Sequence, residues 1–153
     1  MELLPYRDEH LALTEALELD PETMSELGGP ADPDDIPRVH KMRIDTVAKG
    51  EWYFAILPEP SGPPVGAIGI WQSRIQGEPI HEVGWMVLPE FQGRGIAKEA
   101  LRILIDRARA DLRYGRIHAF PGVTNAPSNA LCRGAGFTHV EATEVRELDV
   151  SST

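Results

Sequence analysis

A turn that contains two glycines and an arginine separates a strand-like segment from a helix-like one. In "VLPEFQGRGIAKEALRILIDRARA", residues 87–110, the apolar run gives way to an amphipathic pattern from Ile96. The first amide N–H groups of a helix have no partner within the helix and lie at the positive end of its dipole. Gly93 and Gly95 would leave this backbone open to a bound group, and Arg94 adds positive charge. The turn therefore predicts a phosphate-binding site.

Two familiar phosphate-binding motifs do not fit this turn. The dinucleotide fingerprint G-x-G-x-x-G/A needs a small residue where this chain has Lys98, and the P-loop pattern is absent. A zinc-protease motif H-E-x-x-H is not formed, because Trp85 stands in place of the second histidine, and the other histidines lack metal-ligand spacing. We therefore expect no metal. Taken alone, the turn could also be a glycine-rich connection without a ligand.

Two blocks of residues extend the pattern beyond the turn. The first, "EVGWMVLPEFQGRGIA", ends in "QGRGIA" (92–97), which matches the signature Q/R-x-x-G-x-G/A. The second, "NAPSNALCRGAGF" (125–137), follows after the length of one helix and one strand. Together these blocks resemble the GCN5-related N-acetyltransferase (GNAT) family over residues 80–137. Within the family they look most like the ribosomal-protein-alanine N-acetyltransferase branch, as does the early "DPETMSELGGP".

The order of expected elements agrees with this resemblance. A chain of 153 residues, of which 42% are apolar, is long enough to form one core. We predict a single domain with the GNAT fold, an α+β architecture in which about four helices flank a mixed, mostly antiparallel sheet of six to seven strands. The expected helices are 8–19, 37–50, 96–112 and 126–135, and the expected strands are 2–6, 51–57, 65–71, 80–88, 116–120, 137–142 and 144–150.

The resemblance implies acetyl-CoA as the cofactor. The backbone amides that would hold its pyrophosphate belong to Gln92, Gly93, Arg94, Gly95, Ile96, Ala97 and Lys98. Family members have a bulge at the end of the fourth strand, here near Met86, Val87 and Leu88, where the Val87 amide would bind the thioester carbonyl. Asn125 matches the family asparagine that helps to hold the cofactor arm, with Ser128 nearby, although both could instead cap the helix that follows.

Acetyl transfer to an amine needs a base, because an ammonium group cannot attack a thioester. Glu82 is the candidate base. It would share the cleft-lining face of its strand with Gly84 and Met86, and a carboxylate among apolar neighbours tends to have a raised pKa. The alternative is an ordinary charged residue at the solvent edge. Much of the family has a tyrosine as proton donor where this chain has Cys132, which is a weak donor candidate and more often a small buried apolar residue.

Charge is unevenly divided along the chain, whose net charge is −9. Residues 1–90 carry 6 Lys and Arg against 17 Asp and Glu, whereas residues 91–153 carry 9 against 7. The resemblance assigns the basic part to the polyanionic cofactor, so the acidic part predicts a cationic amine acceptor. We expect acceptor specificity to come from residues 20–50 and from a loop at 72–79. The overall acidity argues against a nucleic-acid partner.

The chain has no apolar run that could span a membrane, and its N-terminus lacks signal-peptide features. With one cysteine, no internal disulfide can form. We therefore expect a cytoplasmic monomer or homodimer that binds no membrane. The first functional hypothesis is an N-acetyltransferase that moves acetyl from acetyl-CoA to a protein N-terminus or a small-molecule amine by direct attack in a ternary complex. The second, kept open by the missing tyrosine, is a catalytically silent acyl-CoA-binding or regulatory protein.

Overall fold

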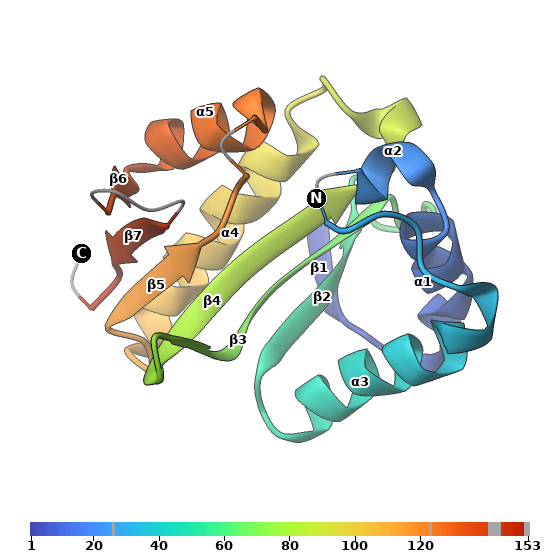
Figure 1. Cartoon of the computed structure of the whole chain (residues 1–153), viewed down its shortest axis with the longest axis horizontal. Helices are drawn as coiled ribbons and strands as arrows, with labels where there is room; N and C mark the ends of the chain where they lie inside the picture. The colour runs from blue at the N-terminus through green and yellow to red at the C-terminus, as the bar shows by residue number, and fades with distance from the viewer. Residues whose placement is uncertain (26, 123, 141–144, 152–153) are drawn as a thin grey trace.

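The structure is a computed structural model that describes residues 1–25, 27–122, 124–140 and 145–151. Over these residues the chain forms a seven-stranded sheet in the order β1-β2-β3-β4-β5-β7-β6 (Figure 1). Neighbouring strands are antiparallel, except that β4 and β5 are parallel. The strands are β1 (Glu2–Pro5), β2 (Trp52–Leu57), β3 (Gly66–Ile75), β4 (Glu78–Val87), β5 (Arg116–Ala119), β6 (Thr138–His139) and β7 (Arg146–Asp149). The α-helices are α1 (Leu11–Glu18), α2 (Pro21–Met24), α3 (Ile36–Ala48), α4 (Ile96–Asp111) and α5 (Ala126–Ala135).

Helices lie on both faces of the sheet (Figure 1). On one face, α4 and α5 pack against the larger apolar cluster, which includes Val83 of β4, Leu104 of α4 and Cys132 of α5. On the other face, α1 and α3 cover the part formed by β1 to β3, with Leu17 of α1 and Ala55 of β2 in the smaller cluster. In the part of the chain that the structure describes, no helix lies in front of β4 and β5 on this second face (Figure 1). The predicted α+β fold is confirmed.

The predicted apolar stripe of α4 forms the centre of the larger cluster. Its buried members are Ala100, Leu101, Leu104, Ile105 and Ala108. Leu112, the last residue of the predicted helix, is not part of this buried stripe and is 71% exposed. Leu112 is the C-cap, with φ of 61°, so the backbone leaves the helical path there and the side chain no longer follows the stripe.

Residues 72–79 form a β-hairpin rather than the predicted loop. β3 continues to Ile75 and β4 starts at Glu78, and the connection is Gln76-Gly77 with φ of 50° and 82°. Two consecutive residues of positive φ match the twist of the flanking strands, which is why such turns favour glycine. This segment therefore extends the sheet instead of supplying a flexible acceptor loop.

β4 and β5 separate beyond the position at which they pair. Glu82 of β4 is the partner of His118 of β5, and β5 ends at Ala119 whereas β4 continues to Val87. The two strands diverge from this position in Figure 1. The bulge expected near residues 86–88 is absent on the β3 side, because the β3–β4 register is unbroken up to Val87. The separation therefore comes from the divergence of β5.

Two other boundaries differ from the predictions. The first predicted helix is divided into a 3-10 turn, Asp8–His10, and α1 from Leu11. The short helix α2 begins with Pro21 at its first position and Asp20 as its cap, a signal that the helical periodicity did not contain. Residues 141–144, within the last two predicted strands, lie outside the described residues.

Candidate active site

The glycine turn leaves the start of α4 open. Gly93 and Gly95 have φ of 76° and 74°, and a Cβ added to either would meet no atom within 4 Å. Gly95 is the N-cap and has no side chain with which to accept from the first amides of the helix. The amides of Ile96, Ala97 and Lys98 therefore donate to no N-cap side chain and lie at the positive end of a 16-residue helix. This backbone fits a pyrophosphate group.

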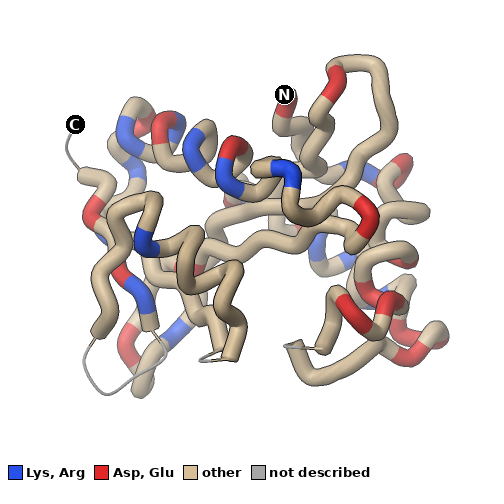
Figure 2. The backbone as a smooth tube through the Cα atoms, turned by 90° about the horizontal axis from the view of Figure 1, so that it is seen from above, with Lys and Arg blue, Asp and Glu red and all other residues tan. Residues whose placement is uncertain are grey.

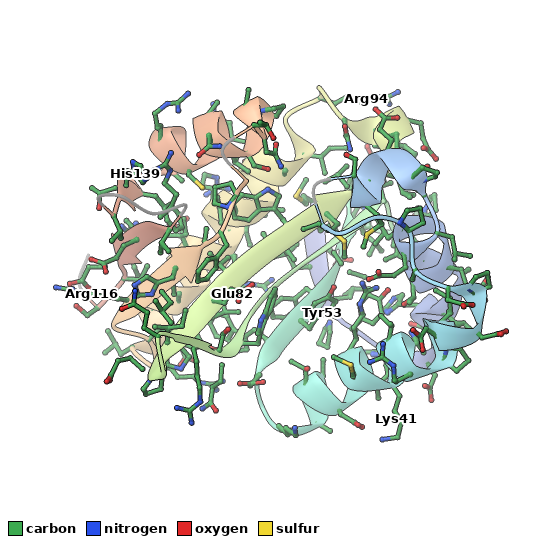
Figure 3. All side chains as sticks on the ribbon, in the orientation of Figure 1. Lys41, Tyr53, Glu82, Arg94, Arg116 and His139 are labelled. Carbon is green, nitrogen blue, oxygen red and sulfur yellow. The ribbon has the colours of Figure 1, made fainter. Side chains whose placement is uncertain are left out.

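The turn is fixed to the end of β4 by a side chain. The Gln92 amide nitrogen donates to the Val87 carbonyl oxygen at 2.9 Å. Arg94 is exposed, with its guanidinium 5.4 Å from the centre of the Phe91 ring, and it lies beside the start of α4 (Figure 3). The Gln92 side chain thus has a structural role, while Arg94 and Lys98 are free to add positive charge near the turn.

The amides at the end of β4 point alternately to its two edges. The Leu88 N–H donates to the Val65 carbonyl at 2.9 Å, on the side of β3, so the Leu88 amide is already used. Because successive amides of a strand point to opposite edges, the Val87 N–H is directed towards the side of β5, and that of Met86 towards β3. Among the three predicted residues, Val87 is the one whose amide faces the gap that opens between β4 and β5.

Glu82 lies in the middle of β4, at the start of this gap, and is half-buried. Glu82 shares one face of β4 with Met86, as predicted. Met86 packs with the smaller cluster on this face, whereas Val83 and Val87 belong to the larger cluster on the opposite face. Burial raises the pKa of the Glu82 carboxyl, and a hydrogen bond with Ser73 offsets part of this shift. A carboxylate of raised pKa is a stronger base than an exposed glutamate.

A histidine and a second glutamate continue the row that starts at Glu82. His118 of β5 is paired with Glu82, and its Nε2 lies 3.0 Å from Oε2 of Glu147 on β7. The His118 side chain is 12% exposed, and Glu147 also pairs with Arg116. No sequence motif indicated His118 or Glu147, because their juxtaposition depends on strand order, which no motif encodes.

Asn125 caps α5, and Ser128 supplies the amide that it caps. The Asn125 side-chain oxygen accepts from the Ser128 N–H at 3.2 Å. Within the described residues, no hydrogen bond joins either of these side chains to the glycine turn. Cys132 lies one helical turn further on, fully buried in the larger cluster, and burial raises the pKa of its thiol to about 11. This environment is that of a small apolar side chain.

Comparison with known proteins decides the family. The model of the acetyltransferase (GNAT) domain family matches residues 1–138. The chain belongs to this family. FsC-acetyl coenzyme A-N(2)-transacetylase of Aspergillus fumigatus is 29% identical over 159 residues, which cover 92% of this chain and 63% of that protein. This chain therefore spans less than two thirds of the length of that relative.

Solved structures share the GNAT fold at low sequence identity. Spermidine N-acetyltransferase from Vibrio cholerae, in complex with CoA and spermine, has a TM-score of 0.77 and 15% identity, covering 99% of this chain and 96% of its own. Ribosomal-protein-alanine N-acetyltransferase from Brucella melitensis has a TM-score of 0.74 and 21% identity, covering 97% and 96%. These two proteins act on different amines, so the likeness supports the fold and leaves the acceptor open.

A buried polar network in this GNAT domain joins α1, α3 and Tyr6, the residue directly after β1. Arg43 of α3 forms an ion pair with Glu18 of α1, and the two side chains are 8% and 11% exposed. Thr14 bonds both the Tyr6 hydroxyl, at 2.7 Å, and His40 Nδ1, at 2.9 Å. This network was not predicted from the sequence, although polar residues on the apolar faces of two predicted helices were a signal for it. The network holds in place the two helices that cover β1 to β3, on the same face of the sheet as Glu82.

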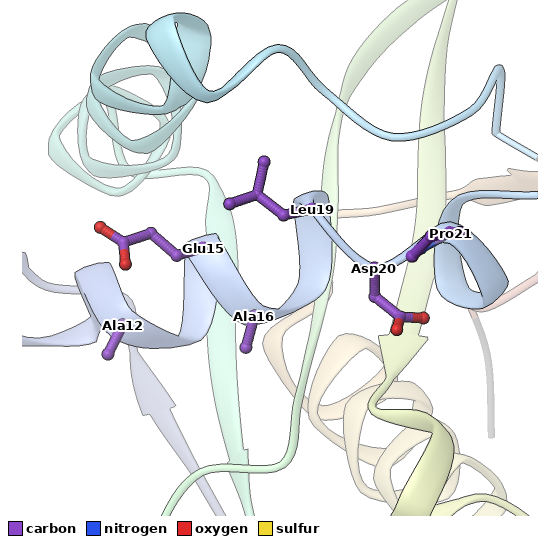
Figure 4. Close-up of a pocket in the computed structure, with 6 residues that line it drawn as sticks. All are labelled: Ala12, Glu15, Ala16, Leu19, Asp20 and Pro21. Atoms are coloured by element: carbon purple, nitrogen blue, oxygen red, sulfur yellow. The ribbon is translucent and has the colours of Figure 1, made fainter.

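The acidic side of this GNAT domain lies at the end formed by α1 to α3. Asp and Glu gather at this end in Figure 2, whereas Lys and Arg are frequent along α4. A shallow hollow on the outer surface of α1 and α2 carries two carboxylates, Glu15 and Asp20 (Figure 4). The Asp20 carboxylate accepts from the Thr23 amide at 2.6 Å, and that bond lowers its pKa. The hollow therefore contributes acidic surface at this end of the molecule. Its residues are Ala12, Glu15, Ala16, Leu19, Asp20 and Pro21.

The described residues form neither a metal site nor a membrane span. They contain no group of three or more His, Cys, Asp or Glu side chains placed to hold a metal ion. None of the helices that the structure describes combines the length and the apolar character needed to cross a bilayer.

Proposed function

We propose that this GNAT domain is an N-acetyltransferase that moves the acetyl group of acetyl-CoA to a primary amine. The observation that supports this most is the uncapped start of α4 directly after β4, with open space at Gly93 and Gly95. A helix start of this kind binds phosphate through its backbone and needs no particular side chain. Acetyl-CoA would supply an activated thioester next to the gap between β4 and β5.

The residues of the turn have separate roles in this proposal. The amides of Ile96, Ala97 and Lys98 hold the pyrophosphate, and Gly93 and Gly95 leave the space that it occupies. Arg94 and Lys98 add two exposed positive charges. The Val87 amide, directed towards β5, donates to the thioester carbonyl and stabilises the negative charge that develops there. Asn125 and Ser128 shape the opposite side of the cofactor site, because they form the cap at the start of α5.

Glu82 removes the proton of the acceptor ammonium in this proposal. The Val87 amide lies about 16 Å from Glu82 along β4, because a strand rises about 3.3 Å per residue. This span is too long for the Glu82 carboxylate to reach an amine beside the Val87 amide directly. We therefore assign Glu82 to a proton transfer through intervening water. The leaving thiolate takes its proton from water, since Cys132 is fully buried.

The acceptor in this proposal is a cation that approaches from the side of α1 to α3. This end carries the acidic surface, and the basic residues lie along α4 (Figure 2). An acidic rim raises the local concentration of an ammonium-bearing acceptor. A protein N-terminus, the acceptor of the ribosomal-protein-alanine branch that the sequence blocks suggest, is one such acceptor, since it carries an ammonium group. A polyamine is another.

A thiol-release assay with acetyl-CoA tests the proposal. The acceptors should include a peptide with a free N-terminal alanine, a linear polyamine and an aminoglycoside. We expect CoA release that depends on the amine and saturates with it. CoA binding without release by any of these amines would instead support the silent acyl-CoA-binding protein, for which the missing tyrosine remains the motive.

A further inference from the structure

The indole of Trp71 lies across the sheet on the same face as Glu82. Trp71 of β3 is the direct partner of Glu82 of β4, and the next pair on this face is Gly69 with Gly84. A Cβ added to Gly84 would lie 2.5 Å from the Trp71 Cη2 atom. The indole therefore occupies the place where a side chain at position 84 would start. Any residue other than glycine there would displace it.

Tyr53 supports the indole from the other side. Tyr53 of β2 is the partner of Gly69, so it shares the face of Trp71, and the two ring centres are 6.1 Å apart. The Arg43 guanidinium lies 5.3 Å from the centre of the Tyr53 ring, and Tyr6 packs edge-on at 5.1 Å. Tyr53 is thus held by the buried polar network of α1 and α3. Figure 3 shows Tyr53 and Glu82 on either side of β3.

Trp71 and Tyr53 together form an aromatic surface, and its Trp71 end is accessible. Trp71, Glu82 and Gly84 are only half-buried, and no helix lies in front of β4 on this face within the described chain (Figure 1). A half-buried indole beside a partly desolvated carboxylate matches an ammonium group on an apolar carbon stem. The stem packs on the ring, and the cation is attracted both by the π face and by the carboxylate.

We propose that Trp71 is a specificity-determining residue of the acceptor site, and that it selects protonated amines carried on apolar stems over hydroxylated ones. This inference rests on the proposed function, since it takes the Glu82 carboxylate as the group that first attracts the acceptor cation, before its amine moves along β4 to the thioester beside the Val87 amide. Gly84 is a positioning residue in this arrangement, because its missing side chain makes room for the indole. Tyr53 fixes the orientation of the ring.

The first test compares acceptors in Trp71→Ala and Trp71→Phe. The panel pairs amines of similar length, such as hexylamine with a hydroxylated aminoalcohol. We expect Trp71→Ala to raise KM for the apolar amine about tenfold, the range of a cation–π contact plus lost apolar contact, with little change for the hydroxylated one. Trp71→Phe should retain most of the preference. The affinity for acetyl-CoA should stay unchanged in both variants.

Trp52→Phe is the matched control. Trp52 is also a half-buried strand tryptophan, but it packs on the opposite cluster, with its ring centre 5.1 Å from that of Tyr114. This variant should leave the acceptor preference as in the wild type. An equal change of KM across the panel in Trp71→Ala, or the same loss in Trp52→Phe, would overturn the proposal.

Gly84→Ala tests the same inference without touching the aromatic ring. The added methyl should displace the indole, so the variant should show the acceptor selectivity of Trp71→Ala. In the double variant the two changes should not add, because both act through one ring. Independent, additive effects would contradict the proposed role of Gly84.

A binding measurement separates this inference from the proposed function. Titration of the CoA-loaded protein with hexylammonium, followed by calorimetry, does not need turnover. Binding that is lost in Trp71→Ala would support the site even if no amine were acetylated, and the proposed function alone would then fail. Binding that is equal in wild type and Trp71→Ala, or absent from both, would reject the role of Trp71 itself.

Discussion

Glu82 of β4 and His118 of β5 are partners at the position where these two parallel strands begin to separate. The pairing places a carboxylate of raised pKa and an imidazole on one face, at the closed end of the gap. His118 is in turn held by Glu147, and its Nδ1 is buried without a hydrogen-bond partner in the part of the chain that the structure describes. The gap therefore has titratable groups at its base and open backbone amides at its mouth.

Replacement of Glu82 by Gln should lower kcat by about 10²- to 10⁴-fold, the usual contribution of a general base. The pH profile adds a second expectation. A base acts when deprotonated, and burial raises the pKa of Glu82, so the acidic limb of the wild-type kcat/KM profile should lie above the pKa of an exposed glutamate. That limb should disappear in Glu82→Gln, while the acetyl-CoA affinity changes little.

The same substitution should raise stability at neutral pH. A carboxyl whose pKa is higher in the folded than in the unfolded protein loses stability as the pH rises from the unfolded pKa through the folded one. Glu82→Gln removes this penalty, so its Tm should exceed that of the wild type at pH 7 and approach it near pH 4. For the kinetic prediction, a Glu82→Gln variant that kept the wild-type kcat across the whole pH profile would show that another group is the base.

Gly95→Glu should weaken CoA binding at least about tenfold. The variant places bulk, a disfavoured positive φ and a negative charge where the phosphates are proposed to lie. Gly115→Glu is the control, because Gly115 is also exposed with open space around it but lies beyond the C-terminal end of α4. Calorimetric titration with CoA measures both. Equal affinities in two folded variants would place the cofactor elsewhere.

The parts of the fold predicted from sequence were those with a local signal. The period of α4, the boundaries of α5 and the glycine turn are each encoded within a few neighbouring residues. The position of Trp71 over Gly84 and the ion pair of Glu18 with Arg43 are not, because they join residues far apart through strand register and helix packing. The hairpin at Gln76-Gly77 did have a local signal, the glycine of a two-residue turn, but the predicted loop at 72–79 was too long.

Cys132→Ala should keep kcat within about tenfold of the wild type and lower the free energy of unfolding by about 1–3 kcal/mol, as for a small cavity in the core. The thiol is fully buried, and its pKa is raised to about 11, so it should react with iodoacetamide only after unfolding. Alkylation kinetics in native buffer and in denaturant measure this. A large pH-dependent fall in kcat with intact cofactor binding would identify the thiol as the proton donor.

Arg43→Ala should lower the free energy of unfolding by about 3–5 kcal/mol, because it leaves the Glu18 carboxylate buried without its partner. Lys41→Ala is the control on the same helix. Lys41 pairs with Asp45 at 2.7 Å but is 75% exposed, so its loss should change the free energy by less than about 1 kcal/mol. Urea denaturation of both variants distinguishes them. Similar losses would mean that the buried network contributes little.

Acceptor binding should weaken as salt is added, if the acidic end formed by α1 to α3 attracts a cation. Exposed charges are screened over about 8 Å at physiological ionic strength, so KM for the acceptor should rise clearly with added salt while kcat changes little. Replacing Asp32, Asp34 and Asp35 by Asn should raise KM at low salt. Asn can retain the cap that Asp32 now provides, in which its carboxylate accepts from the Asp34 amide at 2.9 Å.

The control for this prediction removes the same number of charges at the other end of the molecule, in Asp106, Asp111 and Asp149. If the attraction is local to α1 to α3, this variant should keep the wild-type KM and its salt dependence, whereas the first variant should lose most of that dependence. Steady-state kinetics at several ionic strengths compare the two. A KM that is independent of salt, or a best acceptor that is neutral or anionic, would leave the acidic end with a role in solubility alone.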